Sequence, residues 1–340
     1  MRRWIAVVPL ATLLITVVQA LAATPEVVRD EPGIAEHRPS RSEGYLVWSE
    51  FSLEDFRTHS QVMADGGEPV RINPIGTQSG TAMIDGTTVA YAEEERGGSD
   101  IRFYDPVTQD RSDPPDGVNT DARETSPALS GDWLLFRRVN SNLVRFRNTV
   151  VKLILVNLVT GERRKLVDSQ HDRRFVTTGQ VNGDWLTYES CRFRDFDFEN
   201  CQQFLYQIST ETKTKTPNPG VQQYAGGVTT DGTVYLVRSG GPRRWTCGDN
   251  ARIVRVPLGG QDEVIARLPD GIDALSAFAF EDAYDSVTYY IARGSCRTGD
   301  EGIYAIRNAD TATMSDADRV GSSGATSSRG DRIALERSAP

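Results

Sequence analysis

A short phrase recurs along this chain at intervals of about fifty residues. Each copy has a small or acidic residue and a glycine, followed by a run of alternating aromatic and β-branched residues. The copies begin at Ser42, Asp85, Ser130, Asn182, Asp231 and Arg329, with a degenerate copy at Glu281-Asp282. The glycines Gly86, Gly131, Gly183 and Gly232 are 45, 52 and 49 residues apart. Seven copies of one supersecondary unit predict a repeat architecture.

The third repeat shows the strands of one unit most clearly. Runs suited to strands span Thr125–Leu129, Trp133–Val139, Val150–Asn157 and Arg163–Val167, with a tight turn at Gly131. Glycine and proline fall between such runs in all repeats, and helical periodicity is absent. Four antiparallel strands per unit predict the blade of an all-β propeller. A closed ring also removes the exposed edge strands that an open stack of the same units would leave.

The number of blades depends on how the two ends of the chain are read. The second-strand phrase occurs seven times, but complete four-strand units number six, because the last copy (Ala325–Ser338) has only its first two strands. The segment Pro25–Glu31 precedes the first copy and is placed to supply an outer strand to that incomplete unit. The prediction is therefore a seven-bladed ring closed by strands from both ends. A six-bladed ring with a spare C-terminal hairpin is the alternative.

The N-terminal segment has the pattern of a secretory signal. Arg2 and Arg3 precede an apolar run from Trp4 to Val18, and Ala20-Leu21-Ala22 is a small-x-small cleavage site. We therefore predict a signal peptide over residues 1–23 and a single propeller domain over residues 24–340, in a secreted, periplasmic or cell-envelope protein. The alternative is an uncleaved anchor that tethers the propeller to a membrane, because about 20 apolar residues can span a bilayer. No later stretch approaches that length.

The charge of the chain argues against nucleic-acid binding. The formal net charge is −9, and loss of Arg2 and Arg3 with the signal would make it −11. An acidic chain without a basic stripe repels phosphate backbones.

The four cysteines all follow the export signal, so disulfides are the default interpretation. Cys191 and Cys201 flank one loop, and Cys247 and Cys296 lie in equivalent loops of successive repeats. We predict the pairs Cys191–Cys201 and Cys247–Cys296. A zinc site competes with this interpretation, but the chain has no Cys-x-x-Cys spacing and no histidine beside these cysteines.

The repeat resembles the TolB-type, WD-like propeller repeat, in which a Ser-Pro-Asp-Gly turn is followed by an apolar strand. The best match is SPALSGDWLLF at Ser126–Phe136, and NLVTGE at Asn157–Glu162 is similar to the family's later turn. The resemblance covers most of residues 36–337, without the domain that precedes the propeller in TolB itself. It implies an extracytoplasmic propeller that presents a protein-binding face. Similar repeats also occur in peptidase and lyase propellers, so the fold does not decide the function.

Long loops that join second to third strands are expected on one face of the ring. They span 138–149, 190–202, 239–251 and 293–301 and contain all four cysteines. Arginines beside aromatic residues in these loops are typical anchors for protein or acidic ligands. The candidate binding residues are Arg145, Arg147, Arg243, Arg244, Trp245, Asp195 and Asp197. Calcium binding by Asp195, Asp197 and Glu199 is the alternative for one loop, where alternating phenylalanines favour a plain hairpin.

Signatures of catalysis are sparse. The three histidines, His37, His59 and His171, share no metal-ligand spacing, and the elbow Gly-x-Ser-x-Gly is absent. We therefore assign no catalytic residue, no metal ligand and no cofactor. The sequence favours a binding or scaffold module whose partner is another envelope or extracellular protein. The alternative is a hydrolase or lyase that acts on an extracellular polymer.

Overall fold

The computed structural model is built of strands joined by turns and extended connections. It describes residues 26–32, 34–52, 57–95, 98–140, 150–169, 174–194, 197–218, 220–239, 252–267, 273–281, 286–293, 301–307 and 330–335, and none of these is helical. In this part of the chain there is accordingly no helix of the length and apolarity needed to cross a membrane. The expected signal segment, residues 1–23, lies outside the described residues.

Consecutive strands pair antiparallel in small units, as the repeat predicts. The first unit has β2 (Ile34–Ser42), β3 (Tyr45–Ser52), β4 (Arg57–Ala64) and β5 (Val70–Arg71), and the second has β6 (Gln78–Asp85), β7 (Thr88–Glu95), β8 (Gly98–Tyr104) and β9 (Arg111–Ser112). The third has β10 (Arg123–Ser130), β11 (Trp133–Asn140), β12 (Val150–Asn157) and β13 (Arg163–Asp168). These bounds agree with the strands expected in the third repeat.

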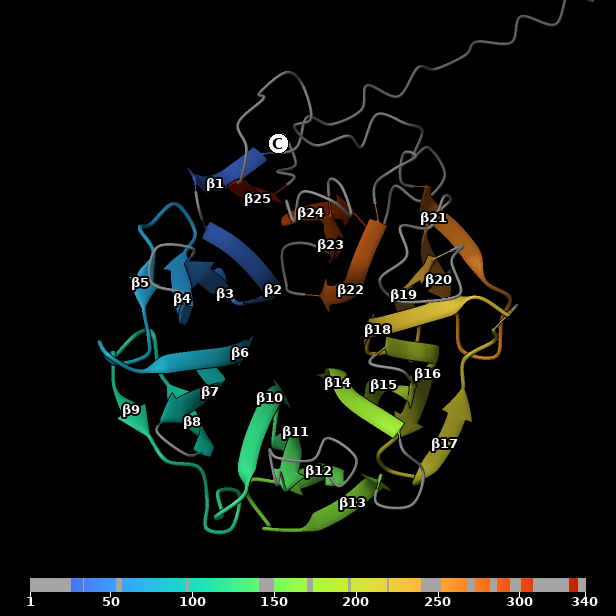
Figure 1. Cartoon of the computed structure of the whole chain (residues 1–340), viewed down its shortest axis with the longest axis horizontal. Coiled ribbons are helices and arrows are strands. Elements are labelled where there is room, and N and C mark those ends of the chain that lie inside the picture. The colour runs from blue at the N-terminus through green and yellow to red at the C-terminus, as the bar shows by residue number, and fades with distance from the viewer. Residues whose placement is uncertain are drawn as a thin grey trace, which may run out of the picture.

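The remaining units follow the same plan. The fourth has β14 (Arg174–Asn182), β15 (Trp185–Arg194), β16 (Asp197–Gln207) and β17 (Thr212–Lys215), and the fifth has β18 (Gln222–Val228), β19 (Val234–Ser239), β20 (Arg252–Val256) and β21 (Glu263–Arg267). The sixth has β22 (Asp273–Glu281), β23 (Ser286–Arg293) and β24 (Glu301–Arg307). In Figure 1 the units lie around a common centre, and the first strand of each lies innermost.

The two ends of the described chain pair with each other. β1 (Glu26–Pro32) runs antiparallel to β25 (Gly330–Leu335), with Glu26 opposite Leu335 and Pro32 opposite Gly330. β25 also forms a parallel bridge to β24, between Ile333 and Ile303. The predicted pairing of the N-terminal segment with the last repeat is therefore present.

Apolar residues of the second strands form the core between the units. Leu46 and Trp48 of β3 and Leu186 and Tyr188 of β15 are almost completely buried in one cluster. Trp133 and Trp185, which begin their strands, are partly buried against neighbouring clusters. The tryptophans of the phrase therefore serve packing.

The turn of the phrase also ties each of the first four units to its neighbour. Gly86, Gly131 and Gly183 have φ values of 55°, 51° and 56°, in the left-handed region that glycine tolerates best. The backbone amide of each glycine donates to the residue that begins the phrase in the preceding unit. Gly86 donates to Ser42 Oγ at 2.9 Å, Gly131 to Asp85 Oδ2 at 2.6 Å and Gly183 to Ser130 Oγ at 3.2 Å. A small or acidic residue recurs there because the next unit needs its oxygen.

Replacing Asp85 by alanine should destabilise the protein by about 1–2 kcal/mol, because the Gly131 amide loses a charged acceptor. Asp85→Asn keeps an acceptor oxygen and should lose less than half of that. Urea unfolding of the two variants measures the difference. Equal stability of Asp85→Ala and wild type would show that this contact between units contributes nothing.

Candidate functional site

One end of the units carries the connections that lead into the innermost strands. We call this end the linker face and define it by the linkers 72–77, 113–122 and 216–221, which join β5 to β6, β9 to β10 and β17 to β18. Because strands alternate in direction within a unit, the connections from second to third strands lie at the same end. The sequence placed its candidate binding residues at this end.

The first linker turns sharply at Pro74-Ile75-Gly76. The Thr77 amide donates to Pro74 O at 3.2 Å, and Gly76 has a φ of 95°. Arg71 fixes this turn, because its guanidinium donates hydrogen bonds to the backbone carbonyls of Asn73, Pro74 and Thr77 at 3.0–3.1 Å. Ile75 stands at the tip with 95% of its surface exposed.

The second linker repeats this arrangement at Pro115-Asp116-Gly117. The Val118 amide donates to Pro115 O at 3.2 Å, and Gly117 has a φ of 77°. Arg138 of β11 donates to the carbonyls of Gly117 at 3.1 Å and Val118 at 2.7 Å. Arg163 of β13 adds bonds to the carbonyls of Asp116 and Gly117.

The third linker is also held by an arginine. Arg238 of β19, only 1% exposed, donates through Nη2 to Pro217 O at 2.7 Å. The Asn218 side chain accepts from the amides of Gly220 and Val221 at 2.8 and 3.0 Å. In all three linkers, an arginine satisfies backbone carbonyls that the turn leaves without a partner in the sheet.

Carboxylates in turn hold two of these arginines, one of them buried and one exposed. Glu124 of β10 is fully buried, and Arg138 Nε donates to its Oε1 at 2.6 Å. Burial raises the pKa of Glu124, although hydrogen bonds from Thr120 and Arg138 oppose the shift. Asp262 pairs with Arg238. Burial opposes ionisation of Asp262, but the hydrogen bond and charge of Arg238 outweigh it and lower its pKa.

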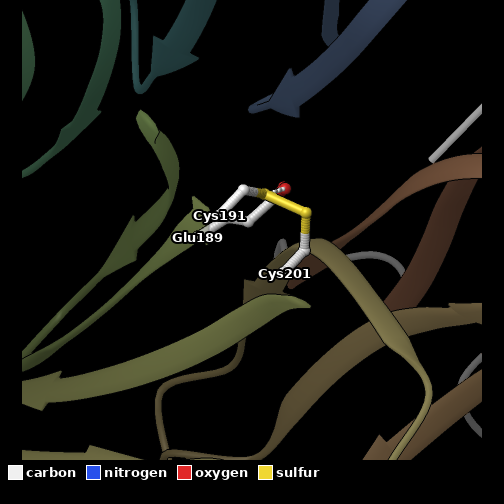
Figure 2. Close-up of side chains that lie close together, drawn as sticks. All are labelled: Glu189, Cys191 and Cys201. Carbon is white, nitrogen blue, oxygen red and sulfur yellow. Dashed lines mark hydrogen bonds between the residues drawn. A yellow bond between two sulfur atoms is a disulfide. The ribbon is translucent and has the colours of Figure 1, made fainter. Parts of the chain in front are cut away.

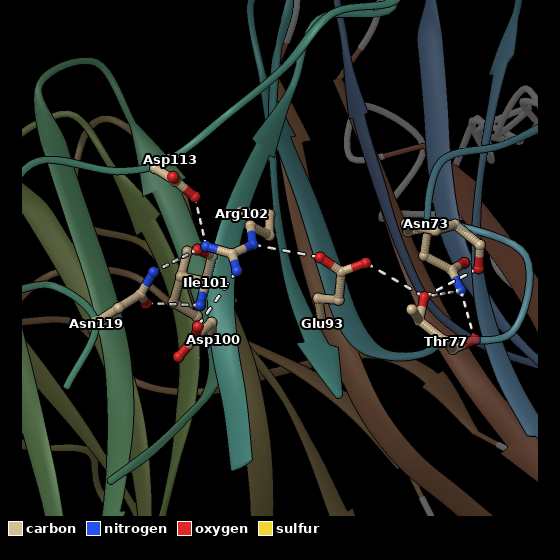
Figure 3. A network of polar contacts seen from close by, with 9 residues as sticks. Asn73, Thr77, Glu93, Asp100, Ile101, Arg102, Asp113 and Asn119 are labelled. Atoms are coloured by element: carbon tan, nitrogen blue, oxygen red, sulfur yellow. Dashed lines mark hydrogen bonds and ion pairs between the residues drawn. The ribbon is translucent and has the colours of Figure 1, made fainter. Parts of the chain in front are cut away.

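A further network joins the first linker to the second unit (Figure 3). Glu93 of β7 accepts from Thr77 Oγ1 at 3.2 Å and lies 3.3 Å from Arg102 Nε. Arg102 also pairs with Asp113 and, at 3.3 Å, with Asp100. Both carboxylate oxygens of Glu93 therefore accept hydrogen bonds from protein side chains, and they connect the β5–β6 turn to β8.

The predicted disulfide Cys191–Cys201 is present. It joins β15 to β16, and both residues are completely buried. Glu189, also completely buried, precedes Cys191 by two residues on β15, and its Oε1 lies 2.6 Å from Cys191 Sγ (Figure 2). Residues i and i+2 of a strand share a face, so the sequence Glu-x-Cys already contained this proximity. This proximity of Glu189 to the disulfide was not predicted from the sequence.

The other candidates from the sequence cannot be placed. Cys247, Cys296 and the five residues Arg145, Arg147, Arg243, Arg244 and Trp245 lie outside the described residues, as do Asp195 and His171. Asp197 is the first residue of β16 and lies in the hairpin with β15. His37 and His59 lie on β2 and β4, opposite Ser49 and Glu50 of β3.

Comparison with solved structures supports the fold. Over 82% of its length the chain aligns with 40% of a prolyl endopeptidase chain, at 15% identity and a TM-score of 0.53. The chain folds as a β-propeller. It also aligns with the β-propeller domain of the Trilobed protease from Pyrococcus furiosus over 79% of this chain and 81% of that one, at 8% identity and a TM-score of 0.49. TolB from Acinetobacter baumannii aligns over 78% and 77% of the two chains, at 11% identity and a TM-score of 0.44.

These similarities carry no function. Identities of 15% and below show the fold alone, and the propeller spans less than half of the prolyl endopeptidase chain. No model of a protein family matches the chain, and no curated protein matches it either.

Proposed function

We propose that this chain is an exported propeller that binds another protein through its linker face. The observation that carries the proposal is Ile75, a β-branched apolar residue with 95% of its surface exposed on a turn that Arg71 fixes by three hydrogen bonds. A loop that is already ordered loses little conformational entropy on binding. An apolar side chain at the tip of such a loop is suited to fill a pocket of a partner.

The polar groups of this face support binding rather than hydrolysis. Glu93 and Glu124 accept hydrogen bonds from internal donors, and Asp262, in the β20–β21 connection, pairs with Arg238, which holds the third linker. Their carboxylates hold the linkers in place, so they serve the shape of the surface. This use of charge fits a rigid recognition surface better than an active site, whose acid and base must reach substrate.

Further parts of the proposal concern the whole chain. We infer cleavage of residues 1–23 on export, a single propeller over residues 24–340, and a TolB-like repeat. The six units each place their first strand near the common centre, whereas β1 and β25 lie farther out (Figure 1), which favours the six-bladed alternative over seven blades. In that ring, the paired chain ends extend the sixth unit.

The test compares two exposed apolar residues on opposite faces. Ile75→Asp should abolish capture of the partner from a cell-envelope fraction, because a charge replaces the proposed anchor. Val159→Asp lies at the β12–β13 turn, where 74% of the valine is exposed, and should capture as wild type does. Quantitative mass spectrometry of the captured proteins measures both variants. Identical profiles for Ile75→Asp and wild type would refute the proposed surface.

A further inference from the structure

Two sulfur atoms and one carboxylate meet inside the fourth unit (Figure 2). Glu189 and Cys191 point from the same face of β15, and Cys201 lies on the neighbouring strand β16. All three side chains are completely buried. Their ligand atoms, one oxygen and two sulfurs, all lie within 4.8 Å of one another.

The three residues are held close by the backbone rather than by a flexible loop. β15 and β16 pair over most of their length, with Ser190 opposite Gln202 and Arg192 opposite Glu199. The register shifts between these pairs, and Asn200 takes a φ of 52° there. The Cα atoms of Cys191 and Cys201 are 3.9 Å apart. Cleavage of the disulfide would therefore leave two thiols beside the Glu189 carboxylate.

Such a set of donors has a recognisable chemistry. Thiolates together with a carboxylate bind divalent ions of the zinc class, at about 2.3 Å for sulfur and about 2.0–2.2 Å for oxygen. Donors of one tetrahedral ion are about 3.5–4 Å apart. A bound ion therefore requires the two sulfurs to separate once their bond is broken, and the Glu189 oxygen to move away from Cys191 Sγ, which it approaches to 2.6 Å. A buried carboxylate is costly to desolvate unless it is protonated, paired or bound to a metal. A divalent cation would offset two of the three negative charges that Glu189 and the two thiolates bring together.

We propose that reduction of the Cys191–Cys201 disulfide creates a zinc-class metal site made by Glu189, Cys191 and Cys201. A dithiol reductant supplies two electrons and two protons, the S–S bond breaks, and the dithiol becomes a disulfide. The metal ion then displaces both thiol protons, which pass to solvent. The same pair of cysteines thus joins β15 to β16 covalently when oxidised and through a metal ion when reduced. This proposal does not depend on the protein-binding role of the linker face.

Cobalt(II) is the probe, because thiolate ligation gives it a charge-transfer band in the near ultraviolet. The full mature chain is reduced with a phosphine without oxygen and titrated with cobalt(II), then with zinc(II). We expect one cobalt ion per chain with the thiolate band, displacement by zinc, and no binding to the oxidised chain. Glu189→Gln should weaken zinc binding about tenfold or more, and Cys191→Ser should abolish the thiolate band.

Two further variants separate this site from the alternatives. Glu124→Gln changes another fully buried glutamate, far from the sulfurs in sequence, and should bind cobalt as the wild type does. Cys247→Ser should do the same. Circular dichroism of each reduced variant checks that it is folded. A folded, reduced wild type without the thiolate band overturns the proposal. So does a band that survives in Cys191→Ser, or an unchanged zinc affinity in Glu189→Gln.

Discussion

Replacing Arg138 by methionine is expected to destabilise the protein by about 3–5 kcal/mol, the usual cost of removing one partner of a buried ion pair. Glu124 is fully buried, and Arg138 Nε is 2.6 Å from its Oε1. Methionine keeps much of the length of the side chain but leaves a buried carboxylate without its guanidinium. The carbonyls of Gly117 and Val118 lose their donor as well. Urea unfolding at neutral pH measures the loss.

The pH dependence of this loss identifies its cause. Burial raises the pKa of Glu124 in the folded protein, so the folded state binds the proton more tightly than the unfolded state does. The stability that protonation provides is fully present below the unfolded pKa and is lost as pH rises through the folded pKa. Without Arg138, the folded pKa should rise further. The deficit of Arg138→Met should therefore be largest at neutral pH and shrink as pH falls.

A double variant provides the control. Glu124→Gln combined with Arg138→Met removes both charges and should recover part of the stability that Arg138→Met loses, because no carboxylate remains to be buried. If the double variant is no more stable than Arg138→Met, the loss comes from the carbonyls of the linker rather than from the ion pair. If Arg138→Met alone loses less than about 1 kcal/mol, the pair does not stabilise the linker face.

Local patterns in the sequence were sufficient for the main features of the fold. The bounds of β10 to β13 follow from alternation and turn residues, because strands and tight turns depend on neighbours along the chain. The pairing of β1 with β25 followed from counting strands per repeat. The Cys191–Cys201 bond followed from a short separation within one hairpin. The strand bounds and the disulfide depend on residues within one repeat, and the pairing of the chain ends depends on the number of repeats.

The candidate site depended on contacts that no local pattern encodes. Pro74-Ile75-Gly76 is readable as a turn, but the exposure of Ile75 depends on how the first linker lies over Arg71. Arg138 was expected where the second strand meets a long loop, and it does lie on β11, but its bonds to carbonyls about twenty residues earlier in the chain were not predicted. Sequence reasoning favoured arginines that face solvent. The described arginines of this face instead work inside it.

The innermost strands contain a second feature that the sequence did not predict. Their pairing with the second strands shifts register at similar places, such as Ser79/Ala82 in β6 and Thr178/Val181 in β14. The first unpaired residue of each shift is a glycine, Gly80 in β6 and Gly179 in β14. Neither has a positive φ, so backbone strain does not require glycine at either position. What differs is the space around the two glycines.

Gly179→Ala is expected to destabilise the protein by about 3 kcal/mol or more, beyond the usual cost of overpacking, because backbone atoms block the new methyl group. A Cβ at Gly179 would lie 2.6 Å from Gly226 O and 2.9 Å from Thr187 O, and closer still to Thr187 Oγ1. These carbonyls belong to the neighbouring strands β18 and β15. The methyl group would therefore push the fourth and fifth units apart.

Gly80→Ala is the matched control, since a Cβ there meets only the Ala92 Cβ at 3.5 Å, an ordinary contact. It should change stability by less than about 1 kcal/mol, in either direction. Thermal and urea unfolding of both variants gives the comparison. Removing the Thr187 hydroxyl with Thr187→Ala should not restore the stability of Gly179→Ala, because the Gly226 and Thr187 carbonyls remain. Rescue would mean that only a movable side chain opposes the methyl group, and that the two units do not approach each other as closely as this geometry requires.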